Sequence, residues 1–273
     1  MKADLHVHST ASDGTARPAD LVALALERGL RVLAITDHDS VEGLPEALEA
    51  AKGTPLTLIP ALELSAVQEG RDVHILGYFV RHDDAALAAQ LADMREARLN
   101  RAVSMVRLLG ESGYELDVDS VLELSDGGAV GRSHVARALV DAGHAESIRD
   151  AFERLIGRGR PYYVSKDART PAEAIQTVRR AGGLAVVAHP GVNGLDPVID
   201  SMIAEGLGGI EAYHADHSAE QRAHYAEMAS AAGLLVTGGS DFHGAAAPNP
   251  ALGSVRLPEG AIAALLDWGR EHG

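Results

Sequence analysis

The chain has 273 residues, of which 46% are hydrophobic, so it can bury one large core of the size of a barrel domain. Its 39 acidic and 24 basic residues give a formal charge of −15, which argues against binding long duplex nucleic acid through Lys and Arg contacts to phosphate. It has no cysteine, which excludes disulfides, thiolate metal sites and cysteine nucleophiles. Without a charged leader or an apolar stretch of roughly 20 residues, we expect a cytoplasmic protein with no membrane partner, and nothing indicates a protein partner.

Short apolar runs alternate with amphipathic segments in the first ninety residues. Strands are predicted over Ala3–Val7, Arg31–Ile35, Leu56–Ile59 and Val73–Phe79. Helices are predicted over Pro18–Arg28, which has proline in its first turn, and again after Ser40.

The middle of the chain breaks this alternation. Between residues 84 and 159 we find only helical patterns, over Ala85–Leu109, Val118–Leu124, Ser133–Asp141 and Glu146–Ile156. We therefore expect a helical insertion over residues 85–159 in a catalytic domain formed by residues 1–84 and 160–273. Because insertions in barrels occur on loops, it is expected to roof the site.

The alternation then resumes to the end of the chain. Helices are predicted over Pro171–Ala181, Pro197–Glu205, Ser218–Ala232 and from about Pro258 onward, and strands over Leu184–Ala188, Gly209–Tyr213 and Leu234–Thr237. This order is typical of βαβ units with a parallel sheet. Six or seven repeats favour a closed (β/α) barrel over an open doubly wound sheet.

Imidazoles and carboxylates follow the predicted strands. His6 and His8 are two residues apart, so on a strand they point the same way and can hold one ion, although two ordinary surface or core histidines would show the same spacing. Glu63 stands between leucines, where a buried acid is costly unless it is paired or bound to metal. Strand ends converge at one face of a barrel, so we predict one cluster. Its members are His6, His8, Asp13, His38, Glu63, His74, His189, Asp241 and His243.

Nine nitrogen and oxygen donors are more than one ion needs, so we expect two or three divalent ions. The donors suit Mn²⁺, Zn²⁺ or Fe²⁺, with Mn²⁺ the first expectation. Asp37 and Asp39 flank His38, and we assign them catalytic roles, either in support of His38 or as a proton shuttle, with turn capping as the alternative.

Four of these segments together resemble the motifs of the PHP (polymerase and histidinol phosphatase) phosphoesterases. They are Asp-Leu-His-Val-His-Ser from Asp4, Thr-Asp-His-Asp from Thr36, Ala-His-Pro-Gly from Ala188 and Ser-Asp-Phe-His from Ser240. The insertion, Gly131-Arg132-Ser133-His134 and Tyr162-Tyr163-Val164-Ser165 resemble the branch that acts on nucleoside 3′,5′-bisphosphates or removes 5′ nucleotides from short RNA. Position 13 is Asp where some members have His.

The resemblance implies a distorted (β/α)₇ barrel with a trinuclear site and a metal-bridged hydroxide as the nucleophile. It implies that His6, His8, Glu63 and Asp241 hold the first ion, that Asp13, His38 and His243 hold the second, and that Glu63, His74 and His189 hold the third. We also expect substrate contacts from the insertion and from two further loops, through Arg132, His134, Lys166 and His217.

Three alternatives remain beside the bisphosphate phosphatase. A 5′→3′ exonuclease on short RNA would use the same chemistry, and the acidic charge favours short substrates. A histidinol-phosphate or other small-molecule phosphomonoesterase would share barrel and metals, but it would need no second phosphate clamp. A non-catalytic module would be expected to have lost part of the ligand set.

Overall fold

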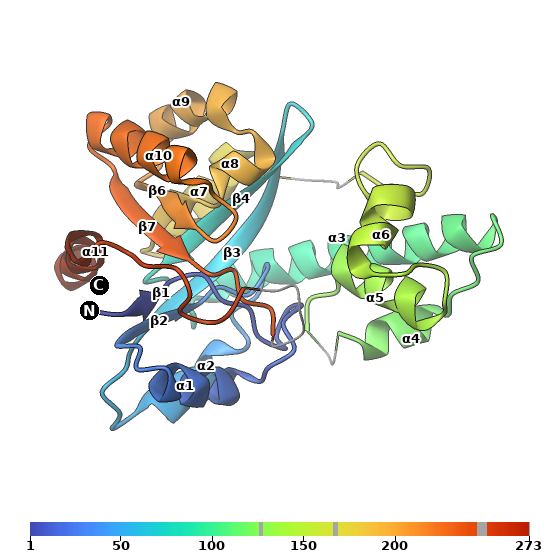
Figure 1. Cartoon of the computed structure of the whole chain (residues 1–273), viewed down its shortest axis with the longest axis horizontal. Coiled ribbons are helices and arrows are strands. Elements are labelled where there is room, and N and C mark those ends of the chain that lie inside the picture. The colour runs from blue at the N-terminus through green and yellow to red at the C-terminus, as the bar shows by residue number, and fades with distance from the viewer. Residues whose placement is uncertain (126–127, 166–168, 245–249, 273) are drawn as a thin grey trace.

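The computed structural model describes residues 1–125, 128–165, 169–244 and 250–272 (Figure 1). Its strands form one seven-stranded sheet in sequence order. They are β1 (Ala3–Asp4), β2 (Val32–Ile35), β3 (Thr57–Gln68), β4 (Arg71–Tyr78), β5 (Leu184–Val187), β6 (Gly209–His214) and β7 (Leu235–Gly239). The first and last strands meet, because the Leu5 amide donates to the Gly238 carbonyl at 3.3 Å and Val7 forms a parallel bridge with Phe242. The predicted distorted barrel is confirmed.

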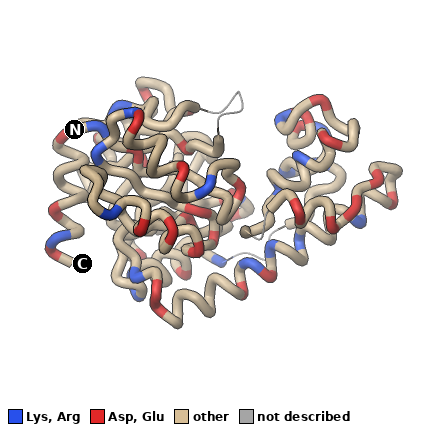
Figure 2. Tube along the Cα trace, turned by 90° about the horizontal axis from the view of Figure 1, so that it is seen from below, with Lys and Arg blue, Asp and Glu red and all other residues tan. Residues whose placement is uncertain are grey.

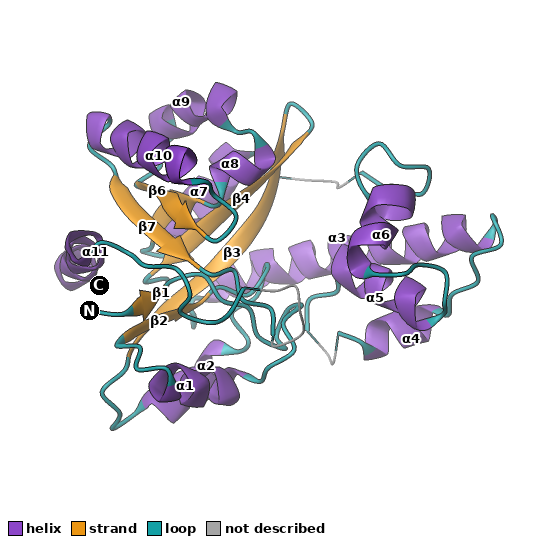
Figure 3. Cartoon of the chain, viewed as in Figure 1, coloured by secondary structure: helices purple, strands orange, loops and turns teal. Residues whose placement is uncertain are grey.

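Helices surround this sheet on its outer side (Figure 3). They are α1 (Pro18–Glu27), α2 (Leu44–Ala51), α7 (Pro171–Arg180), α8 (Pro190–Asn193), α9 (Asp196–Ala204), α10 (Ala219–Ala231) and α11 (Glu259–His272). Capping residues set several of their ends. Thr170, for example, precedes α7 as its N-cap: its side chain accepts from the Glu173 amide, and the Glu173 side chain accepts from the Thr170 amide. Among the described helices around the sheet, the short helix α8 was not predicted from the sequence. None of the described helices is both long and apolar enough to cross a membrane.

One strand runs against the prediction of a parallel sheet. β4 is antiparallel to both β3 and β5. The reason is a two-residue turn, Glu69-Gly70, in which both residues have positive φ, 48° and 72°. Such a turn matches the twist of a hairpin, so β3 returns directly as β4 without a crossover helix. The amino end of β4 therefore lies at the same edge of the barrel as the carboxyl ends of the parallel strands.

The regular secondary structure in the described part of the insertion consists of helices, joined by loops (Figure 3). It contains α3 (Ala85–Gly110), α4 (Val118–Glu123), α5 (Arg132–Asp141), α6 (Ile148–Ala151) and a π-helical turn (Phe152–Ile156), so the predicted helix Glu146–Ile156 is two pieces. α3 contributes side chains to two hydrophobic cores. Leu87 and Leu91 belong to the core of the barrel, whereas Met105 and Leu109 pack with Leu139 of α5 in a separate core of the insertion. That the insertion begins at residue 85 stays a prediction. The packing of α3 against both cores favours a boundary between barrel and insertion inside this helix.

Candidate metal centre

Glu63 lies at the centre of an imidazole cluster at the mouth of the barrel. Its side chain is 1% exposed. Nitrogens of five histidines lie 2.8–3.2 Å from its two carboxylate oxygens: His6, His8, His38, His74 and His189. Burial alone would raise the pKa of Glu63, but the imidazoles of His38 and His6 hold it well below its ordinary range. The carboxylate is therefore ionised and shared by several neighbours.

Two further carboxylates complete the cluster. Asp241 Oδ1 lies 3.1 Å from His8 Nε2 and 3.4 Å from His6 Nε2. Asp13 Oδ1 lies 3.2 Å from His243 Nε2, 3.8 Å from His8 Nδ1 and 4.0 Å from His38 Nε2. Burial opposes ionisation of both acids, yet the neighbouring imidazoles hold the pKa of each well below its usual value. The nine predicted ligands are thus brought into one continuous cluster.

The backbone at this edge is held in unusual conformations. Asp39, His189 and Asp241 have φ values of 49°, 28° and 53°, a region that residues other than glycine rarely occupy. Such strain persists only where the surrounding structure enforces it, and it concentrates at functional sites. Here it occurs in the segments that follow β2, β5 and β7, which carry the cluster residues His38, His189 and Asp241.

The donors suit divalent cations. An octahedral ion with ligands at about 2.1 Å separates adjacent donors by about 3 Å, and a tetrahedral ion by about 3.4 Å, which brackets most of the separations above. Three buried atoms of the cluster, His8 Nε2, Asp13 Oδ1 and His38 Nδ1, have no hydrogen-bond partner in the described residues. Buried polar atoms normally have a hydrogen-bond partner. These three atoms are exceptions, so their lone pairs are available to a cation. The residues present therefore fit the implied metal ions.

Three of the histidines are also oriented for binding through Nε2. Nδ1 of His6 lies 3.0 Å from Glu211, Nδ1 of His243 lies 2.9 Å from the Asp241 carbonyl, and Nδ1 of His8 lies 3.4 Å from Ser12 Oγ. A ring that donates from Nδ1 keeps the lone pair of Nε2 free for a metal.

Glu211 was missed by the sequence analysis. It lies on β6, is fully buried, contacts His6, and accepts a 2.8 Å hydrogen bond from the His189 amide. An acid inside an apolar strand, the signal that identified Glu63, would have found it. His214 was missed as well: its Nδ1 accepts from the Asp216 amide, which leaves the proton on Nε2, 3.5 Å from Asp241. At that separation Nε2 makes no hydrogen bond within the described residues.

Asp37 and Asp39, the predicted catalytic acids, are both buried and accept hydrogen bonds from neighbouring segments. Asp37 accepts from the Ser9 amide at 2.8 Å and from the hydroxyls of Ser9 and Ser12 at 2.6 Å. Asp39 accepts from the Ser65 amide at 2.8 Å and pairs with the Arg98 guanidinium of α3. These contacts argue against the predicted proton shuttle and for a supporting role, with Arg98 an unpredicted member of the site.

The predicted substrate residues have different surroundings. Arg132 begins α5 and pairs with Asp72 of β4 at 3.0 Å. His134 accepts the Gly131 amide at Nδ1, so it caps α5 and its neutral ring carries the proton on Nε2. The prediction for His217 is not supported, because Nδ1 donates to the Ala212 carbonyl and Nε2 accepts from the Gly191 amide, which leaves no ring nitrogen for substrate. Lys166 lies outside the described residues.

An unpredicted arginine lies beside Arg132. The guanidinium carbons of Arg101 and Arg132 lie 5.4 and 5.7 Å from the centre of the Tyr163 ring. Arg101 donates from Nε to the Val164 carbonyl, but its buried Nη2 has no hydrogen-bond partner in the described part of the chain. Burial and the nearby Arg132 charge lower the pKa of Arg101 to about 10. Arg101 thus presents an unsatisfied guanidinium donor beside the ion pair of Arg132 and Asp72.

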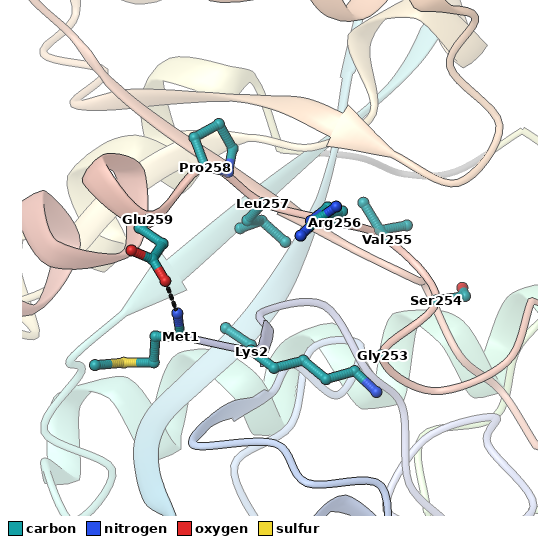
Figure 4. Close-up of a pocket in the computed structure, with 10 residues that line it drawn as sticks. Met1, Lys2, Gly253, Ser254, Val255, Arg256, Leu257, Pro258 and Glu259 are labelled. Carbon is teal, nitrogen blue, oxygen red and sulfur yellow. Dashed lines mark hydrogen bonds and ion pairs between the residues drawn. The ribbon is translucent and has the colours of Figure 1, made fainter.

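A large cavity of about 770 Å³ is found elsewhere, at the opposite end of β1 (Figure 4). Lys2, Arg256 and Glu259 are among its lining residues, and the Met1 ammonium pairs with Glu259. No predicted ligand lines it. Lys, Arg, Asp and Glu are spread over both the barrel and the insertion (Figure 2).

Comparison with known proteins agrees with this geometry. The PHP domain family model matches residues 4–162. A 5′-3′ exoribonuclease of Haemophilus influenzae is 36% identical over 89% of this chain and 90% of its own length. A phosphoribosyl 1,2-cyclic phosphate 1,2-diphosphodiesterase of Eggerthella lenta is 36% identical over 94% of this chain and its whole length. A 3′,5′-nucleoside bisphosphate phosphatase of Chromobacterium violaceum is 36% identical over 88% of this chain and 86% of its own length.

The fold is shared with a solved structure as well. A protein of Bifidobacterium adolescentis, provisionally assigned as a metal-dependent phosphoesterase, has a crystal structure that superposes on this chain with a TM-score of 0.89. The two are 36% identical, and the match covers 98% of this chain and 96% of that one. The histidine–carboxylate cluster, the barrel and these relatives lead to one conclusion: the chain belongs to the PHP domain family of metal-dependent phosphoesterases.

Proposed function

We propose that this enzyme hydrolyses the 3′-phosphate of nucleoside 3′,5′-bisphosphates, releases 5′ nucleotides from short RNA, or does both. One observation carries the proposal: the imidazole–carboxylate cluster of the barrel occurs together with an arginine pair, Arg101 and Arg132, on the insertion. A substrate with two phosphate groups would use both places. In each reaction the phosphate ester that is cleaved occupies the barrel, while the remaining phosphate is held by the insertion.

In the barrel we propose two or three ions, Mn²⁺ first among them, held by the nine clustered side chains. His6, His8, Glu63 and Asp241 form one group, Asp13, His38 and His243 a second, and Glu63, His74 and His189 a third. When bound, such ions polarise the phosphoryl oxygens and activate a water molecule. Glu211 orients His6, and Asp37 and Asp39 hold the loops that carry Asp13 and His38.

On the insertion, Arg132 and Arg101 bind the phosphate that is not cleaved. A guanidinium offers paired donors that match phosphate oxygens, and a bound phosphate would relieve the repulsion between the two cations. His134, with its proton on Nε2, is a further candidate donor. A distant phosphate held in this way positions the reacting ester and excludes substrates that lack it.

The test compares substrates and one variant. Activity of the purified enzyme should disappear with a chelator and return with Mn²⁺. Arg132→Ala should raise KM for adenosine 3′,5′-bisphosphate by roughly 10- to 100-fold, since a charge-assisted contact contributes about 1.5–3 kcal/mol. KM for 4-nitrophenyl phosphate should change little. Arg107→Ala, at an exposed position of α3, is the matched control.

Full activity after chelation would remove the metal mechanism, and an equal KM change for both substrates would remove the clamp. A panel that adds a 5′-phosphorylated oligoribonucleotide, a phosphoribosyl cyclic phosphate and histidinol phosphate separates the remaining candidates. Preference for histidinol phosphate would contradict the proposal, because that substrate has no second phosphate for the arginines.

A further inference from the structure

A hydroxyl of the insertion touches the metal cluster directly. Ser133 is the second residue of α5, and its Oγ donates to Asp13 Oδ2 at 2.7 Å. The two residues are 120 positions apart in the sequence. This is a contact between the first turn of an insertion helix and a side chain of the barrel cluster.

The contact gives the two carboxylate oxygens of Asp13 different surroundings. Oδ2 accepts from Ser133, whereas Oδ1 faces His243, His38 and His8 and has no hydrogen-bond partner in the residues described. Without Ser133 the carboxylate could rotate or offer both oxygens to one ion. With Ser133, a single oxygen is presented to the three imidazoles.

The backbone around this contact is fixed independently of the hydroxyl. The Ala129 amide donates to the Ala11 carbonyl at 3.1 Å. Gly128 lies so close to the same loop that a Cβ would be 2.5 Å from the Thr10 carbonyl oxygen. Removal of the Ser133 hydroxyl should therefore leave the insertion docked and change only the side-chain contact.

We propose that Ser133 is a positioning residue for Asp13 and so sets the affinity of the ion held by Asp13, His38 and His243. This inference rests on the assignment of those three side chains to one ion. Loss of a partner that orients a metal ligand typically lowers metal affinity by roughly 10- to 100-fold. The effect should be confined to one ion, because within the described structure the carboxylate that Ser133 hydrogen-bonds is that of Asp13.

The experiment is a calorimetric titration of Mn²⁺ alone into chelator-stripped protein. Wild type, Ser133→Ala, Ser133→Thr and the exposed insertion variant Ser112→Ala are compared. We expect Ser133→Ala to weaken one binding step by roughly 10- to 100-fold and to leave the others at their wild-type affinity. Threonine, which keeps the hydroxyl, should restore that step, and Ser112→Ala should match wild type.

Two results would overturn the inference: Ser133→Ala binding Mn²⁺ with unchanged number and affinity, or an equal loss at every step accompanied by a lower melting temperature. The titration contains no substrate, so its outcome is separate from that of the proposed function. An enzyme inactive on every phosphorylated substrate would refute the function and leave this result standing.

Discussion

The mouth of the barrel and the facing side of the insertion carry buried groups of opposite charge. In the barrel, Glu63, Asp241 and Asp13 are surrounded by imidazoles and are ionised in spite of burial. On the insertion, Arg101 and Arg132 lie together, and the Nη2 donor of Arg101 is buried without a hydrogen bond in the described structure. On the proposed function, the first region binds metal ions and the second binds a phosphate. A phosphorylated substrate bound between metal ions and guanidinium groups would need both.

The two regions also differ in how they are built. The barrel ligands stand on β3 and β4 or on the segments that follow other strands of one continuous sheet. The two arginines stand instead on helices with a core of their own around Met105, Leu109 and Leu139. Apart from Arg98 and Ser133, whose side chains contact Asp39 and Asp13 of the barrel, the insertion can therefore vary in sequence with little effect on the metal ligands. Relatives with three different activities at the same 36% identity are consistent with that division.

The largest effect is expected for Glu63→Gln, which tests whether the barrel carries the chemistry. Gln keeps the shape but removes the charge shared by five imidazoles. We expect the metal content to fall and kcat/KM to drop at least about a thousandfold, or about 4 kcal/mol, for every substrate. Metal analysis and steady-state kinetics measure this. The exposed variant Glu49→Gln is the control, and a Glu63→Gln enzyme that retains its ions and activity would contradict the comparison.

A smaller and selective effect is expected for Arg101→Met, which tests the insertion. KM for adenosine 3′,5′-bisphosphate should rise by about tenfold, or about 1.4 kcal/mol, with metal content unchanged. The free energy of unfolding should not fall much, because methionine removes a buried charge that lies beside Arg132. Arg107→Met on the same helix is the control. A loss of bound metal in Arg101→Met would show that the two regions do not have separate roles.

The smallest effect concerns the barrel without metal. Burial lowers the pKa of His243, but Asp13 and Asp241 outweigh it and raise this pKa from 6.5 to about 10. Because the folded-state pKa is the higher one, protonated His243 stabilises the metal-free fold below about pH 6.5, and this contribution is lost as the pH rises toward 10.

Thermal unfolding of the chelated protein should therefore show a melting temperature that declines between pH 7 and 10. His243→Ala should decline less steeply, and the Mn²⁺-loaded protein should not follow the same profile, because metal replaces the proton. A metal-free melting temperature that rises over this range would contradict the assignment of charge to the cluster.

Much of the barrel site could be predicted because its signals are local. A strand alternates its side chains, so His6 and His8 share a face, and a charged residue in an apolar run needs a partner. The same reasoning would have found Glu211. It could not show that β4 is antiparallel, since this depends on a turn at Glu69-Gly70 with positive φ at both residues.

The sequence by itself determined which side chains can bind cations and that strands and helices alternate around them. Only the tertiary structure decided that Arg101 lies beside Arg132, that Arg98 pairs with Asp39 and that Ser133 contacts Asp13. These contacts join helices of the insertion to each other or to the barrel across 31 to 120 residues. An arginine or serine on a helix surface has the same local pattern whether it faces water or a neighbour, so only packing can assign it a partner.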